Sequence, residues 1–99
     1  MQIEKKARPP KSPEEMALVH HALESPIRRN MIILMSQGVL SVPEIGAAVG
    51  EKMLDYHLHR LELAGLIELS EGKIVLTESG AAYGGLVRRQ KEMGGAGKV

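Results

Sequence analysis

A helical pattern that runs directly into a β pattern constrains the fold of this chain most. Leu54, Leu58 and Leu61 recur at helical spacing, so they are expected to form one buried face of a helix. Gly65 follows that face and tolerates the left-handed conformation in which many helices end. Residues 66–76 then hold two short apolar runs around a Glu-Gly turn, which predicts a β-hairpin. A helix followed at once by a small hairpin is therefore expected.

Serine and threonine caps divide the rest of the chain into helices. Helix starts are predicted after Ser12, Ser25 and Ser41, each followed closely by proline, and a last helix after Thr77. The helix after Ser41 ends at Gly50, close to the Leu54 helix, so these two short helices form a helix-turn-helix candidate. The apolar faces expected elsewhere are Met16, Val19 and Leu23; Ile27, Met31, Leu34 and Met35; Ile45, Ala48 and Val49; and Tyr83, Leu86 and Val87.

The composition excludes several classes of function. The chain has 99 residues, enough for one domain, and no cysteine, which excludes disulfides, thiolate metal sites and cysteine nucleophiles. No apolar run approaches the roughly 20 residues of a membrane span, and the N-terminus lacks a signal-peptide pattern. A cytoplasmic protein without a membrane partner is expected. No phosphate-binding glycine loop or catalytic triad pattern is present, so we expect no enzyme activity, no catalytic residues and no cofactor.

Charge is distributed unevenly along the chain. The net charge is +1, but both ends are net basic and the middle is net acidic. Residues 1–11 are expected to be a flexible basic arm, because Pro9 and Pro10 forbid a helix there. The domain is expected to span 12–92, followed by a glycine-rich disordered tail at 93–99. The basic ends either attract phosphate or simply keep the protein soluble.

Three segments, taken in order, resemble segments of a known family. Ala22–Arg29 has the form AL-x-x-P-x-R, Tyr56–Ile67 contains HL-x-x-L-x-x-AGL, and Leu76–Gly80 has the form LT-x-x-G. In these features the chain is similar to the arsenical-resistance-repressor (ArsR-like) family over about residues 16–80. The resemblance implies a mainly α fold with a small β-hairpin wing, the winged helix-turn-helix. It also implies a prokaryotic transcriptional regulator that binds double-stranded DNA, usually as a homodimer.

Three departures from the family pattern bear on function. Metal-sensing members carry a cysteine pair in the third helix, where this chain has Ser41 and Pro43, so soft-metal sensing at that site is excluded. The turn before the recognition helix is shorter than usual and is flanked by Glu51 and Asp55, whose carboxylates repel phosphates. The expected wing, 70–73, holds a single cation. These departures leave the fold expectation intact and weaken the expected affinity for DNA.

The candidate DNA-binding residues are Lys52, Tyr56, His59, Arg60 and Lys73. The first four lie away from the leucine face of the recognition helix, expected at about 51–64, and Lys73 lies in the wing. The leading end of such a helix enters the major groove, which favours base contacts for Lys52 and Tyr56. Arg60 and Lys73 suit phosphates. The alternative for these residues is an ordinary solvated helix face. The alternative for the chain is a winged helix that serves as a protein–protein interaction or dimerisation module with weak or no DNA binding.

The four histidines do not predict a metal site. His57 and His59 point about 200° apart on a helix, and the neighbours His20 and His21 also diverge. No metal ligand set is therefore expected. By the family resemblance His57 instead occupies the position of a hydrogen-bonded residue that packs the recognition helix against the domain.

Overall fold

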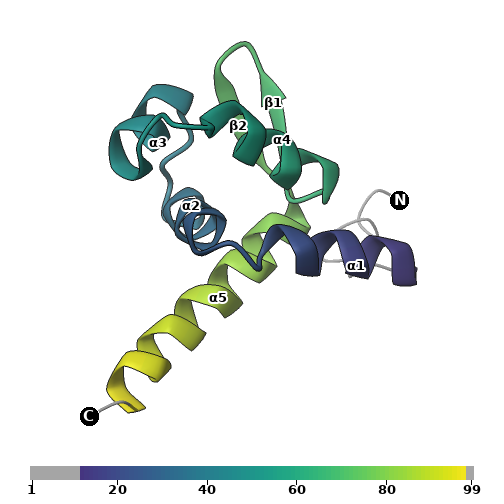
Figure 1. The fold of residues 1–99 in the computed structure, drawn as a ribbon, viewed down its shortest axis with the longest axis vertical. Coiled ribbons are helices and arrows are strands. Elements are labelled where there is room, and N and C mark those ends of the chain that lie inside the picture. The colour runs from purple at the N-terminus through teal and green to yellow at the C-terminus, as the bar shows by residue number, and fades with distance from the viewer. Residues whose placement is uncertain (1–11, 98–99) are drawn as a thin grey trace.

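The computed structural model describes residues 12–97 as five helices and one two-stranded antiparallel sheet (Figure 1). The elements are α1 (Pro13–Ala22), α2 (Pro26–Ser36), α3 (Val42–Val49), α4 (Leu54–Leu63), β1 (Ile67–Ser70), β2 (Lys73–Leu76) and α5 (Glu78–Gly97). The predicted mainly α architecture with one small hairpin is confirmed. The predicted basic arm, 1–11, lies outside the described residues. Helix α5 continues to Gly97, beyond residue 92 where the sequence predicts the domain to end, since no proline interrupts it.

The predicted helix starts are confirmed by hydrogen bonds. The hydroxyl of Ser12 accepts from the Glu15 amide at 3.1 Å, that of Ser25 from Arg28 at 3.2 Å, and that of Ser41 from Glu44 at 3.4 Å. Each bond satisfies one of the amides that a helix leaves unpaired at its start. Local chemistry therefore fixes where α1, α2 and α3 begin.

Helix α4 begins later than the sequence predicts. Met53, just before it, has φ 58°, a left-handed conformation that interrupts the α-helix. The predicted start at about residue 51 is therefore wrong, and Lys52 lies in the turn before the helix. The far end agrees with the sequence, since Gly65 has φ 78° directly after the last turn.

The core is aliphatic and centres on α2 (Figure 1). Helices α1 and α5 lie on one side of α2, and α3, α4 and the hairpin lie on the other. The leucine face of α4 is buried as predicted. The largest fully buried side chains are Val19, Met31, Ile32, Met35, Ile45, Leu61, Leu66 and Ile67.

Several predicted core positions are wrong. Ile27 is 41% exposed, because the inward stripe of α2 runs through Arg28, Met31 and Met35 and leaves Ile27 at its edge. Ala48 is exposed because α3 turns its Gly46 side toward α4. Met16 and Leu86 are also exposed, on the two helices that lie on the same side of α2, at the outer surface of the domain.

Glycine makes the crossing of α2 and α5 possible. A Cβ placed on Gly84 would lie 2.8 Å from Cβ of Ser36 and 3.0 Å from the carbonyl oxygen of Ile32. The two helix backbones therefore approach too closely for any larger residue. Gly85, its neighbour, faces open space. Gly84 is thus a packing residue of the core, in addition to lowering the intrinsic stability of the helix.

Candidate nucleic-acid interface

The hairpin is joined to the start of α3. Strands β1 and β2 pair in antiparallel register from Ile67–Leu76 to Ser70–Lys73, around a turn whose two central residues have positive φ. The Val42 amide donates to the Gly72 carbonyl at 3.1 Å, and the Ile74 amide donates to the Leu40 carbonyl at 2.9 Å. These bonds hold the turn 70–73 against the start of α3, so its position relative to the helices is fixed.

Helices α3 and α4 meet at a glycine. A Cβ on Gly46 would lie 3.1 Å from Cδ2 of Leu54 and 3.3 Å from Cγ of Glu51. The absence of a side chain there lets α4 pack close to α3 through its buried Leu54. The outer face of α4 is left uncovered by the rest of the domain. The structure thus combines a short exposed helix, in contact with β1, with a hairpin turn that is fixed to the start of α3.

The predicted site residues lie around that helix and turn. Tyr56 and His59 are exposed on α4, Arg60 is half-buried there, and Lys52 and Lys73 are exposed in the preceding turn and in β2. Within residues 12–97, no salt bridge or side-chain hydrogen bond engages the cations Lys52, Arg60 and Lys73. The ring of His59 lies 4.0 Å from the carboxylate of Glu62. The structure therefore gathers four of the five residues on and just before α4, with Lys73 on the neighbouring strand.

The same surface also carries apolar and acidic side chains. Met53 is 57% exposed, Tyr56 49% and Leu63 52%. Glu51 and Asp55 are exposed beside Lys52. The leading end of α4 therefore has no net positive charge, and a partner would meet a mixed surface with an aromatic ring at its centre.

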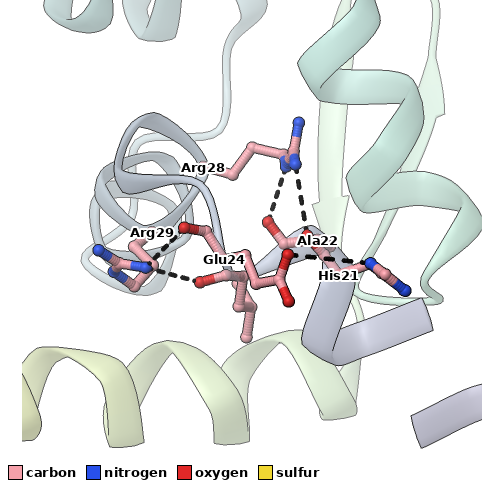
Figure 2. A network of polar contacts seen from close by, with 6 residues as sticks. His21, Ala22, Glu24, Arg28 and Arg29 are labelled. Atoms are coloured by element: carbon pink, nitrogen blue, oxygen red, sulfur yellow. Dashed lines mark hydrogen bonds and ion pairs between the residues drawn. The ribbon is translucent and has the colours of Figure 1, made fainter. Parts of the chain in front are cut away.

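Arg28 is a residue of this region that sequence reasoning missed. Its side chain is buried, with 8% of its surface exposed. Its Nε donates to the Ala22 carbonyl at 2.7 Å and its Nη2 to the His21 carbonyl at 3.4 Å, both at the end of α1 (Figure 2). Carbonyls at a helix C-terminus carry partial negative charge, so this end of α1 suits a cation. The sequence feature that could have identified Arg28 as buried is its position, three residues before Met31, in line with the apolar stripe of α2.

Arg28 also reaches α4. Its Nη1 lies 2.9 Å from Nδ1 of His57, and its Cζ lies 5.9 Å from the centre of the Tyr56 ring. The rings of Tyr56 and His57 meet edge to face, with centres 5.7 Å apart. One guanidinium therefore links the end of α1, the start of α2 and the first turn of α4.

The contact with Arg28 defines the state of His57. A guanidinium only donates hydrogen bonds, so Nδ1 of His57 must accept and the ring must be neutral, with its proton on Nε2. Burial, and to a smaller extent the charge of Arg28, lower the pKa of His57 from its ordinary value of 6.5. The expected hydrogen-bonded packing role of His57 is confirmed.

Three open grooves run along the helices. One of about 580 Å³ lies between α1 and α5, one of about 420 Å³ lies between α2 and α5, and one of about 450 Å³ lies between α2 and α3 with Lys91 of α5 at its lining. Over the described part of the chain, no three histidine or acidic side chains converge as a metal-binding group. None of the helices between residues 12 and 97 has the length and apolar character needed to cross a membrane.

Comparison with models of known protein families, with curated proteins and with solved structures gives no match for this chain.

Proposed function

We propose that this chain is a winged helix-turn-helix protein that binds double-stranded DNA and regulates transcription in a prokaryotic cytoplasm. In this proposal α4 enters the major groove, and the turn 70–73 is the wing that follows the neighbouring backbone. The chain acts as a binding protein and not as an enzyme. The resemblance of three segments to the ArsR-like family supports the same proposal.

One observation carries the proposal: α4 meets α3 at Gly46 and its outer face stays open, while the turn of the hairpin that it contacts through β1 is fixed to the start of α3. A helix of about 10 Å in diameter fits the major groove, which is about 12 Å wide. The hairpin is hydrogen-bonded to the start of α3, so helix and wing would meet DNA as one rigid unit. The cations Arg60 and Lys73 come from these two elements and suit phosphates on either side of the groove.

Tyr56 and Lys52 take a different role in this proposal. They lie at the leading end of α4, where side chains reach base edges. Tyr56 offers a ring for apolar contact and a hydroxyl for hydrogen bonding, and Lys52 offers a donor for guanine. His59 lies on the outer face of α4 with Arg60 and has a polar ring within reach of the backbone. Recognition of sequence is therefore assigned to the first turn of α4 and to the turn that precedes it.

A protein–protein interaction module is the second candidate. The exposed apolar side chains Met53, Tyr56 and Leu63, together with Glu51 and Asp55, favour it. Such a mixture of apolar and acidic groups is unfavourable beside phosphates and ordinary in protein interfaces. In that case the same outer face of α4 would contact another protein.

We also propose that the chain is a homodimer formed through α1 and α5. The groove of about 580 Å³ between these helices has the apolar side chains Leu23 and Leu86 and carries the opposite charges Glu24 and Arg29 at its edges. A surface that holds both charges can complement a copy of itself across a two-fold axis. Sedimentation at tens of micromolar, a concentration range for a useful dimer, is expected to show a dimer. Leu86→Glu should convert it to monomer, and a wild-type monomer would contradict this assignment.

Mapping by nuclear magnetic resonance distinguishes DNA binding from the second candidate. A short mixed-sequence duplex is added to the labelled full chain at low salt. The proposal predicts shifts for amides of α4 and of the turn 70–73, with smaller shifts for α1. A duplex that leaves the α4 amides unchanged, or shifts only the chain ends, would refute the assignment of α4 to the major groove.

A further inference from the structure

We infer that Arg28 is a positioning residue for the outer face of α4, which it holds through His57 and Tyr56 and releases when His57 is protonated. The structural part of this inference is independent of what α4 binds. Its consequence for DNA rests on the proposed function. Arg28 itself is buried and points inward, so it would contact no DNA.

Arg28 is held in place by hydrogen bonds to α1 and to the cap of α2. Two of its nitrogens donate to the carbonyls of His21 and Ala22, and its backbone amide donates to the Ser25 hydroxyl that caps α2. The guanidinium is therefore held by α1 and α2 before it contacts α4. With Nη1 free to donate at 2.9 Å to His57, it presents one hydrogen bond at a fixed place and direction.

Helix α4 lacks a side-chain cap at its start. Its first turn follows Met53 in the left-handed conformation, and no side chain caps its first amides. The helices α1, α2 and α3 each have a serine there. The start of α4 is thus held by the burial of Leu54 and by the bond from Arg28 to His57. The hydrogen bond contributes direction, which apolar packing lacks.

Tyr56 is supported by both Arg28 and His57. Its ring stands against His57 and against the guanidinium of Arg28, while 49% of the residue is exposed. A cation near the face of an aromatic ring attracts it, and more strongly where water is excluded. Arg28 and His57 therefore support from behind the tyrosine ring that α4 presents outward.

Protonation of His57 reverses these contacts. Nδ1 changes from an acceptor to a donor, so the hydrogen bond from Arg28 is lost and two cations face each other. Besides Arg28, the titratable groups nearest to His57 in the fold are Tyr56, whose ring it contacts, and Arg60, three residues later on the same helix. Behind Arg28 lie the exposed His21, near the end of α1, and Glu24, just after that helix. The carboxylate of Glu24 lies 3.9 Å from Nδ1 of His21 and is therefore paired with that ring and not with His57. The first turn of α4 should therefore loosen as His57 takes up a proton from solvent.

The chain supplies a matched control for each partner. Arg29 also donates to backbone carbonyls after α1, those of Leu23 and Glu24 at 2.9 and 3.0 Å (Figure 2). It forms no bond to α4. His59 lies two residues after His57 on the exposed side of the same helix. Unlike Arg29 and His59, Arg28 and His57 contact each other.

The test measures amide hydrogen exchange in the full chain at about pH 7.5 and about pH 4.5, the lower value lying well below the ordinary histidine range because the pKa of His57 is lowered in the folded state. Exchange rates are first corrected for the intrinsic effect of pH. Protection of the amides of residues 57 and 58 should fall at the lower pH by on the order of tenfold, the effect of losing one hydrogen bond to a charged group. His57→Gln keeps an acceptor for Arg28 and has no proton to gain, so its protection should not change with pH.

The controls decide between positioning and general destabilisation. His59→Gln should retain the fall seen in wild type. Arg28→Lys carries its three donors on a single nitrogen and cannot reach the carbonyls of α1 and His57 together as the guanidinium does, so it should lower protection of residues 57 and 58 already at about pH 7.5, and Arg29→Lys should not. An equal response to pH in wild type and His57→Gln would overturn the inference, as would loss of the response in His59→Gln.

The same samples give a DNA readout. Wild type should bind a mixed-sequence duplex more weakly at the lower pH, beyond the change seen for His57→Gln. Absence of DNA binding at both pH values would refute the proposed function, while the amide protection would still decide the role of Arg28.

Discussion

The hydroxyl of Thr77 lies 2.7 Å from the carbonyl oxygen of Gly65 and joins the end of α4 to the start of α5. The same oxygen is 3.0 Å from the Leu66 carbonyl, and it accepts from the Gly80 amide at 3.0 Å. One side chain therefore caps α5 and fixes it against the residues between α4 and β1. It connects the segments Tyr56–Ile67 and Leu76–Gly80.

This arrangement predicts the effect of removing the hydroxyl. Thr77→Val keeps the shape of the side chain but removes its donor and acceptor, and should lower the free energy of unfolding by about 0.5–2 kcal/mol, the usual cost of a lost helix cap. Thr77→Ser should retain most of that stability. Denaturant unfolding monitored by circular dichroism measures both. Equal stability of wild type and Thr77→Val would contradict the capping role.

Two adjacent glycines in α5 should respond in opposite directions. Gly84→Ala places a methyl group against Ser36 and Ile32 and should destabilise the fold by about 1–3 kcal/mol, as overpacking does. Gly85→Ala faces open space and should stabilise by up to about 1 kcal/mol through helix propensity. Thermal or denaturant unfolding separates the two variants. If both changed stability in the same direction, the close crossing of α2 and α5 would be wrong.

Two leucines of α4 test its orientation. Leu58 is buried and Leu63 is 52% exposed. Leu58→Ala should cost about 2–5 kcal/mol, the range for emptying a buried leucine site. Leu63→Ala should stay within about 0.5 kcal/mol of wild type. Similar losses for the two variants would show that the helix is turned differently about its axis.

The stability of the fold should depend on pH through His57. Because the folded state lowers the pKa of His57 below 6.5, the unfolded chain binds the proton more readily. Its stabilising contribution is complete above pH 6.5, decreases as the pH falls below 6.5, and levels off below the folded pKa. Urea titrations over this range should show a smaller decrease for His57→Gln than for wild type. His59→Gln should follow wild type, and a parallel decrease in all three proteins would exclude His57 as the cause.

The parts of the fold that sequence predicts well are those set by local chemistry. The serine and threonine caps and the leucine face of α4 each depend on residues within one or two helical turns. The rotation of α2 depends on tertiary packing, which is why Ile27 was expected inside and lies at the surface. The start of α4 was misplaced because Met53 adopts a positive φ, a conformation that sequence assigns to glycine first.

The positions of the candidate site residues were predicted from the sequence, but the contacts of Arg28 and His57 behind them were not. Positions on or next to one helix follow from spacing, so Tyr56 and His59 were correctly placed on its exposed side, while Arg60 is half-buried. Arg28 and His57 are 29 positions apart, and an arginine is ordinarily exposed. Their contact requires the bend between α1 and α2 and the packing of α4, neither of which a sequence pattern specifies.

The salt dependence of DNA binding tests the central proposal most directly. The affinity of the full chain for a duplex of about 20 base pairs, long enough for two half-sites one helical turn apart, is measured across a range of salt concentrations. The logarithm of affinity should fall linearly with the logarithm of salt concentration, by about 0.9 for each phosphate contacted. Arg60→Ala and Lys73→Ala should each reduce that slope by about 1 per bound protomer. Arg89→Ala is the control, since Arg89 is exposed on α5, on the other side of α2 from α4 (Figure 1). A steep slope that only the first two variants reduce is the result predicted here. Binding that is absent at low salt, or whose slope is the same in all four proteins, would contradict the assignment of α4 and the wing to DNA.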